Sequence, residues 1–117
     1  MIIKIIEQIK TGAIKNVKAF GSSEILAPPY IVVKTERREG FKAFRVIAHY
    51  PANCPTELED YTLSIIPQLL NGFTAIDRNG NTNSLYTEGE YTDIIISNDD
   101  ATISMEYIVR MPEKLLF

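Results

Sequence analysis

The chain has 117 residues, 45% of them hydrophobic and 23% charged, a composition that is typical of one globular domain and argues against a fibrous or disordered protein. Twelve basic and fifteen acidic side chains give a formal net charge of −3, so the chain has no general electrostatic attraction for nucleic-acid phosphates. The single cysteine, Cys54, excludes an intramolecular disulfide framework and indicates folding in a reducing compartment such as the cytosol.

The first predicted element is a helix that ends before Gly12. Its isoleucines recur at helical spacing, with charged and amide side chains on the other faces. β-Branched residues are weak helix formers, so we expect packing on a sheet to stabilise this helix. Lys4 and Glu7 interrupt the apolar stretch, which argues against a signal peptide. The longest uncharged run, residues 61–76, is too short and too polar to span a bilayer.

A long β-hairpin is predicted after a short extended segment near residues 17–20. Pro28-Pro29 precedes a β-branched run, a placement that suits the first residues of a strand or a sheet edge. The two strands run over residues 30–38 and 41–50, and Glu39-Gly40 forms the turn. The tip is densely charged, so we expect it to project beyond the core into solvent or toward a partner.

A second helix is predicted to begin at a capping box formed by Thr56 and Glu59. Apolar residues continue at helical spacing until Asn71-Gly72 ends the helix. Pro67 removes a backbone donor, so we expect a kink or a break near the last turn.

The remainder of the chain is predicted to be β structure. Strands are expected over residues 73–78, 91–97 and 102–110, with turns at Asn79-Gly80 and at residues 98–100. The last strand alternates clearly, with one apolar face made by Ile103, Met105, Tyr107 and Val109. The element order α-β-β-α-β-β-β predicts a single α+β domain in which two helices pack on a mixed, mainly antiparallel sheet.

Candidate chemistry in the chain is sparse. His49 and Cys54 are the only residues of their types, and a Cys/His nucleophile pair would need a third group to orient the imidazole. We interpret His49 as a strand end and Cys54 as a loop residue, so we expect that replacing Cys54 with alanine leaves function intact. The carboxylates lack calcium-loop spacing, and we interpret them as turn formers and solvated charges; they are Glu88, Glu90, Asp93, Asp99 and Asp100. No metal, cofactor or catalytic residue is therefore predicted.

The strongest basic cluster lies at the hairpin tip beside Phe41 and Phe44, and consists of Arg37, Arg38, Lys42 and Arg45. Basic residues interleaved with aromatics suit a nucleic-acid groove, but Glu36 and Glu39 dilute this cluster. Two interpretations stay open. The charges either keep an exposed strand pair from aggregating or steer a protein contact.

Two stretches carry a resemblance to a known family. After the N-terminal helix, residues 28–33 read Pro-Pro-Tyr-Ile-Val-Val and enter the hairpin. Near the end, an acidic turn at 88–93 leads to a last strand that closes on Tyr-Ile-Val-Arg-Met-Pro at 107–112. In this order and length the chain resembles the tail terminator, or tail-completion, proteins of long-tailed bacteriophages.

The resemblance implies a structural role in the virion. Such proteins form a ring, typically a hexamer, that seats on the last ring of the tail tube, stops its polymerisation and offers a surface to the head connector. The implied partners are other copies of the chain, the tube protein and the connector, with no membrane or sequence-specific nucleic acid. The implied location is the head-proximal end of the tail, after assembly in the host cytoplasm.

A closed ring needs a head-to-tail interface, which exposed strand edges can supply by pairing. We expect residues 30–50 and the terminal strand to contribute to it. The tip residues expected to face tube or connector are Arg37, Arg38, Glu39 and Lys42. Residues 113–117 are a candidate docking tail, in which Leu115, Leu116 and Phe117 either fold back over the sheet or insert into a neighbouring subunit.

Other functions compete with this interpretation. Another head–tail joining protein, such as a neck adaptor or stopper, would have a similar size and α+β character. A small Cys/His enzyme and a general cytosolic binding module belong to different classes.

Overall fold

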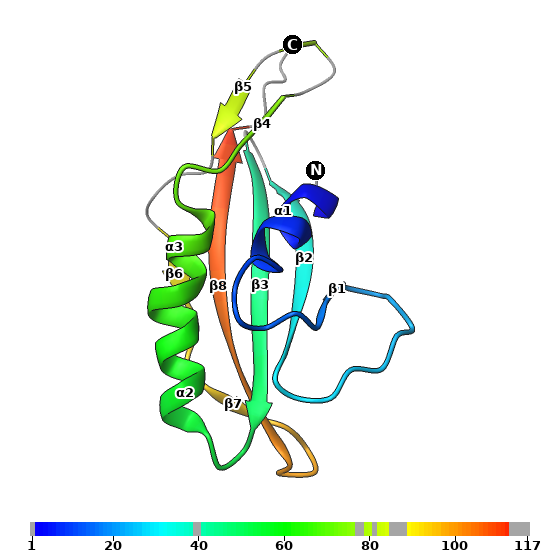
Figure 1. The fold of residues 1–117 in the computed structure, drawn as a ribbon, viewed down its shortest axis with the longest axis vertical. Coiled ribbons are helices and arrows are strands. Elements are labelled where there is room, and N and C mark those ends of the chain that lie inside the picture. Colours follow the sequence, from blue (N-terminus) through cyan, green and yellow to red (C-terminus); the bar gives the residue numbers. More distant parts are fainter. Residues whose placement is uncertain (1, 39–40, 77–78, 81, 85–88, 113–117) are drawn as a thin grey trace.

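The computed structural model describes residues 2–38, 41–76, 79–80, 82–84 and 89–112, and the fold below is that of these residues. It is an α+β arrangement of two helical segments and a six-stranded mixed, mostly antiparallel sheet, which confirms the predicted fold class (Figure 1). The strand order is β1-β2-β3-β8-β6, and β7 also pairs with β8. The elements are α1 (Ile2–Ile9), β1 (Val17–Ala19), β2 (Tyr30–Arg38), β3 (Phe41–Pro51), α2 (Pro55–Asp60), η1 (Tyr61–Ile65), α3 (Ile66–Leu70), β4 (Thr74–Ile76), β5 (Thr82–Ser84), β6 (Glu90–Tyr91), β7 (Ile95–Ile96) and β8 (Thr102–Pro112).

The sheet is built on two unusually long strands. β3 and β8 have 11 residues each and pair antiparallel along their whole length, from Phe41↔Pro112 to Pro51↔Thr102. An average strand has about half that length. The predicted hairpin is confirmed, because β2 pairs with β3 from Tyr30↔His49 to Arg38↔Phe41. The long strands give the molecule its long axis, with extents of 46 × 28 × 26 Å.

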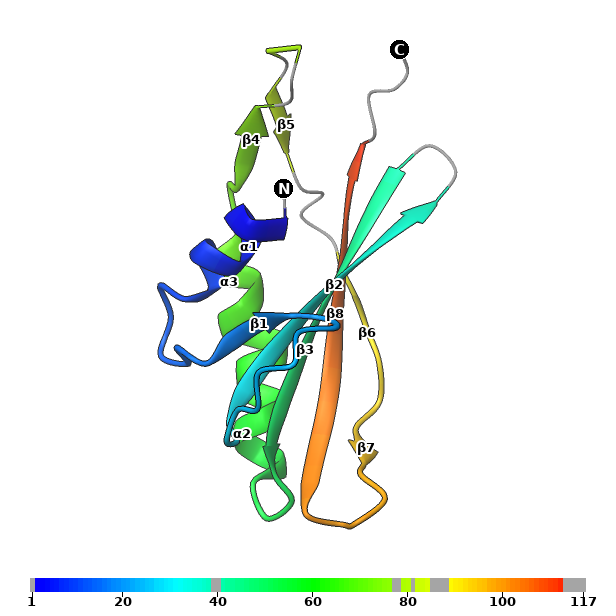
Figure 2. The same ribbon diagram turned by 90° about the vertical axis from the view of Figure 1, so that its right-hand side faces the viewer.

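Both helical segments lie on the same face of the sheet (Figure 2). Alternate residues of the long strands point into this layer, as the period of two predicts. The buried side chains it contains include Ile31, Val33, Phe44, Val46, Ala48, Ile103, Met105, Tyr107 and Val109. The predicted apolar face of the last strand is therefore confirmed.

The N-terminal helix packs as its isoleucine pattern predicts. Ile5 and Ile9 are fully buried in the core. Gln8 Nε2 donates a hydrogen bond of 2.7 Å to the carbonyl of Leu69, which links the two helical segments. Gly12 is more than a helix stop, because a Cβ there would lie 2.7 Å from the Tyr61 hydroxyl. The backbone at Gly12 therefore passes close to Tyr61, and the Ile14 amide donates a hydrogen bond of 3.2 Å to the same hydroxyl.

The start of the second helix corrects the capping-box prediction. The helix begins at Pro55, with Cys54 at the N-cap position and no capping hydrogen bond from a side chain. Proline suits this first position because it has no N–H to leave unsatisfied. Thr56 therefore lies inside the first turn and does not cap the helix.

The effect of Pro67 differs in detail from the prediction. The regular α-helix is interrupted before Pro67, because the π-helical turn η1 follows α2 and precedes α3, which has Pro67 in its first turn. A proline ring crowds the carbonyl four residues before it, and a wider π turn at that point relieves the crowding.

Two β predictions are corrected. The strand expected over residues 91–97 is two short strands, β6 and β7, separated by Thr92 and its two following residues. Thr92 remains tied to β8, since its amide donates to the Glu106 carbonyl at 3.1 Å and its hydroxyl accepts from the Glu106 amide at 3.0 Å. In addition, the short segment near residue 17 is a sheet strand that pairs parallel with β2, which adds β1 to the predicted order.

β4 and β5 pair with each other in a separate two-stranded sheet. Within the described ranges, no helix has the length and apolar character needed to cross a membrane.

Candidate assembly surfaces

The sheet face away from the helices, called the open face below, is polar at its centre. Strand alternation places on it Tyr30, Val32, Lys34 and Glu36 of β2, Arg45, Ile47 and His49 of β3, and Ser104, Glu106 and Ile108 of β8. Figure 2 shows the helical layer on the other side only.

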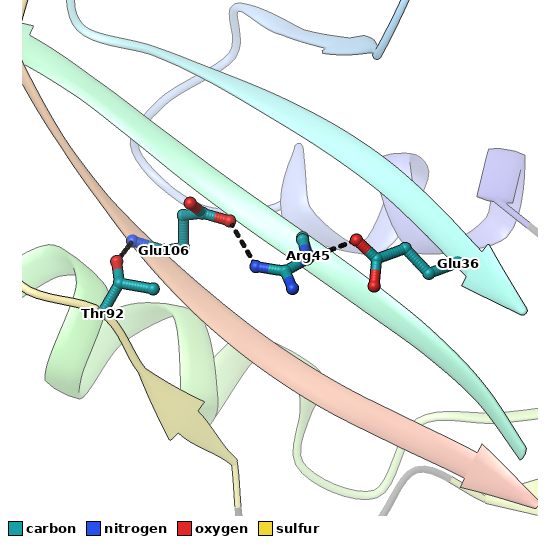
Figure 3. Close-up of polar contacts among 4 residues, drawn as sticks. All are labelled: Glu36, Arg45, Thr92 and Glu106. Atoms are coloured by element: carbon teal, nitrogen blue, oxygen red, sulfur yellow. Dashed lines mark hydrogen bonds and ion pairs between the residues drawn. The ribbon is translucent and has the colours of Figure 1, made fainter. Parts of the chain in front are cut away.

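Arg45 connects the three long strands across the open face (Figure 3). Its Nε donates to Glu36 Oε1 at 2.6 Å, and its Nη1 donates to Glu106 Oε1 at 3.1 Å. The three side chains keep only 20–25% of their accessible surface. The hydrogen bond to Glu36, followed by that to Glu106, raises the pKa of the guanidinium. The arrangement joins the hairpin to β8 by charge-assisted hydrogen bonds.

This geometry divides the predicted basic cluster. Arg45 lies on the open face and is engaged by two carboxylates. Phe44, expected beside the basic residues, is fully buried on the helix side. Among the described side chains, Arg45 and Phe44 therefore lie on opposite faces of the sheet and do not line one groove.

Two of the predicted tip residues come together. Arg37 and Lys42 are direct cross-strand partners, in register with the strand positions that face the helices. They lie near the end of the hairpin, where β2 and β3 point away from the helical layer (Figure 2). The side chain of Arg38, together with Glu39, Leu115, Leu116 and Phe117, lies outside the described residues, as does the proposed tail at 113–117.

His49 and Cys54 are not brought together. The His49 ring stacks on Tyr30 on the open face, with centroids 4.4 Å apart and planes 12° apart. Burial, followed by the charge of Lys18, lowers its pKa. Cys54 instead precedes α2 in the helical layer, and its Sγ donates to Asn53 Oδ1 at 3.3 Å. The two side chains thus have different partners on different sides of the sheet.

Asp99 forms a turn, as the sequence predicts for the carboxylates. Its Oδ1 accepts hydrogen bonds from the Ser97 hydroxyl at 2.6 Å and from the Ala101 amide at 3.0 Å. These bonds, that of Ser97 first, lower the pKa of Asp99. Among the described residues there is no group of three or more His, Cys, Asp or Glu side chains arranged to hold a metal ion. Glu88 lies outside the described residues.

Sequence reasoning missed two surfaces on opposite flanks of the sheet (Figure 1). One is the connection between β1 and β2, residues 20–29, called the β1–β2 loop below. It exposes 63% of Phe20 and 95% of Ile25. The other, called the α2 hollow, is a shallow depression of about 350 Å³ lined by Thr56, Glu59, Asp60, Leu63 and Ser64. One sequence signal could have indicated the first surface: Ile25 directly follows the polar stretch Gly21-Ser22-Ser23-Glu24 and belongs to no apolar pattern of a helix or strand.

Comparison with known proteins gives no assignment. No family model matches the chain, and no curated protein matches it.

Proposed function

We propose that this chain is the subunit of a ring that terminates the tail tube of a long-tailed bacteriophage and joins it to the head connector. The observation that carries the proposal is the shape of the hairpin. Its two long strands end near Arg37 and Lys42 and point away from the helical layer, so that this end of the hairpin projects from the body formed by the helices and the sheet (Figure 2). The resemblance of the N-terminal helix, the proline entry and the terminal strands to tail terminators supports the same role.

The sheet topology supports ring formation. A closed ring needs two different surfaces on each subunit, so that the same contact repeats from copy to copy. The sheet ends in β1 on one flank and in β6 and β7 on the other, and these flanks differ in sequence and shape. The copy number is six if the resemblance extends to assembly.

Arg37 and Lys42 are the described tip residues proposed to contact the tube or the connector. Their alignment on neighbouring strands concentrates positive charge. This positive charge would raise the association rate and the specificity of binding to an acidic partner surface more than it would raise the affinity.

Tube capping tests the proposal directly. Tube protein would be polymerised with the wild-type chain or with the double variant Arg37→Glu/Lys42→Glu, and tube ends would be examined by electron microscopy. We expect wild-type protein to limit tube length and to form a ring at the ends, and the variant to lose about tenfold or more in capping efficiency. The matched control, Lys4→Glu/Lys10→Glu, reverses the same number of charges on exposed positions of α1 and at its C-terminal end.

If the tip variant still capped tubes, the proposed contact of Arg37 and Lys42 with the tube would be wrong. If the wild-type chain did not cap tubes, the terminator role itself would be wrong. Binding to the connector without any effect on tubes would instead favour a neck adaptor or stopper.

A further inference from the structure

We propose that the β1–β2 loop of one copy docks into the α2 hollow of the next copy, with Ile25 seated against Leu63. This contact rests on the proposed ring and names the surfaces that build it. The β1–β2 loop and helix α2, which helps to line the hollow, lie on opposite sides of the molecule in Figure 1, so one copy cannot fill its own hollow with its own loop.

The apolar part of the contact comes from side chains that a monomer leaves in water. Ile25 is 95% exposed, and Phe20 at the start of the loop is 63% exposed. On the other flank, Leu63 in the α2 hollow is 39% exposed. Single exposed apolar residues are ordinary, but a contact between these two flanks would remove Ile25 and Leu63 from water together.

Charge complementarity selects a second copy as the occupant. The β1–β2 loop itself carries one charged residue, Glu24, and two lysines of the adjoining strands lie against it: Lys18 Nζ donates to the Glu24 carbonyl and Lys34 Nζ lies over the Phe20 ring. Residues 53–71, which carry the hollow, contain Glu57, Glu59 and Asp60 and no lysine or arginine. The loop flank of one copy therefore attracts the hollow flank of another and repels a second loop flank.

The loop is held in shape before it binds. Lys18 Nζ donates a hydrogen bond to the Glu24 carbonyl, and the Glu24 amide donates to Ser22 Oγ at 3.2 Å. Lys34 Nζ lies 4.7 Å from the centre of the Phe20 ring. A preorganised loop loses less conformational entropy on docking than a mobile one, which favours its use as a contact.

The repeat of this contact is head-to-tail. Docking one loop into one hollow leaves an unused hollow on one copy and an unused loop on the other, so a third copy can add in the same way. Closure of the series gives a ring, whereas a contact made by the same patch on both copies would stop at a dimer.

Directed cross-linking tests the contact. All variants would carry Cys54→Ala, so that the introduced thiols are the only ones. An Ile25→Cys variant and a size-tagged Leu63→Cys variant would be mixed and oxidised with diamide, which accepts two electrons and two protons as the disulfide forms. The control pairs Leu63→Cys with Ile3→Cys, which is 67% exposed on α1. We expect about tenfold more heterodimer from the first pair.

A charge reversal in the hollow provides the second readout. Glu59→Lys/Asp60→Lys in the Leu63→Cys partner should lower the heterodimer yield about fivefold. Circular dichroism would establish that each variant is folded. A heterodimer yield at the level of the Ile3→Cys control, or an undiminished yield after the charge reversal, overturns the proposal.

The result of the cross-linking test can be distinguished from the result of the tube-capping test. Cross-linking with no capping retains the contact and removes the terminator role. Capping with cross-linking at the control level retains the terminator role and assigns the subunit contact to another surface.

Discussion

The two faces of the central sheet are held by different forces. On the helix side of β3, Phe44, Val46 and Ala48 are completely buried, and their contribution follows from apolar area removed from water. On the open face of the same strand, Arg45 and His49 depend on particular partners placed by the neighbouring strands. Burial is non-directional, whereas charge and ring contacts require geometry. We therefore expect the helix side to supply most of the stability and the open face to supply alignment of the long strands.

The largest effect should come from the helix side. Phe44→Ala removes a fully buried ring between the sheet and the helices, and we expect a loss of about 4 kcal/mol in the free energy of unfolding. Ile47→Ala, on the half-buried open side of the same strand, should cost about 1 kcal/mol. Urea denaturation would measure both. Equal losses at the two positions would break the comparison.

A close approach at the sheet edge gives the next effect. A Cβ on Gly89 would lie 2.0 Å from Cε1 of Tyr107, whose buried ring cannot retreat without disturbing the core. We expect Gly89→Ala to destabilise the protein by about 2 kcal/mol. Combining it with Tyr107→Leu should recover part of this loss in thermal unfolding; a fully additive pair would show that the ring is not the obstacle.

The Arg45 bridge sharpens the comparison from the open side. Arg45→Met keeps much of the side-chain length but leaves Glu36 and Glu106 without the cation between them, and we expect a loss of about 1.5 kcal/mol. In a double-mutant cycle with Glu106→Gln, the losses should be less than additive, because both changes remove the same ion pair. Additivity in the denaturation midpoints would mean that this ion pair contributes no stability.

The smallest effect should be a pH dependence from His49. Because burial lowers its pKa in the folded state below the ordinary 6.5, the unfolded chain binds a proton more readily. Stability from this group is therefore fully present above about pH 7 and is lost as the pH falls below the unfolded pKa. His49→Phe keeps a flat ring on Tyr30 and removes the titration, so its thermal midpoint should fall less between pH 7 and pH 5. Parallel curves for the two proteins would contradict the assignment.

The features that the sequence could predict are those set by local periodicity. Isoleucine spacing predicted α1, and strict alternation predicted the buried face of β8. Two β-rich runs close together in the sequence predicted the pairing of β2 with β3. Each signal lies within one element or between neighbours in the chain.

The features that were missed depend on contacts between distant segments. The bond between Arg45 and Glu106 exists because the β3–β8 register places Arg45 opposite Ile108 and Ile47 opposite Glu106, an alignment with no local signature. β1 has only three residues and is a strand of the sheet because it pairs with β2. The division of residues 91–97 similarly accompanies a shift of one residue in register against β8, between Tyr91↔Tyr107 and Ile95↔Ser104.

The antiparallel pairing of β3 with β8 also gives the molecule an electrical direction. Phe41 lies near the hairpin tip with Arg37 and Lys42, whereas Pro51 lies beside Thr102 and the turn that holds Asp99 and Asp100. The eleven residues of β3 place its two ends about 33 Å apart. In copies that all point the same way, one rim would carry the tip lysine and arginine and the other the turn carboxylates. Such a ring would have unlike poles, so it would fit between two dissimilar surfaces in one orientation and not in the reverse.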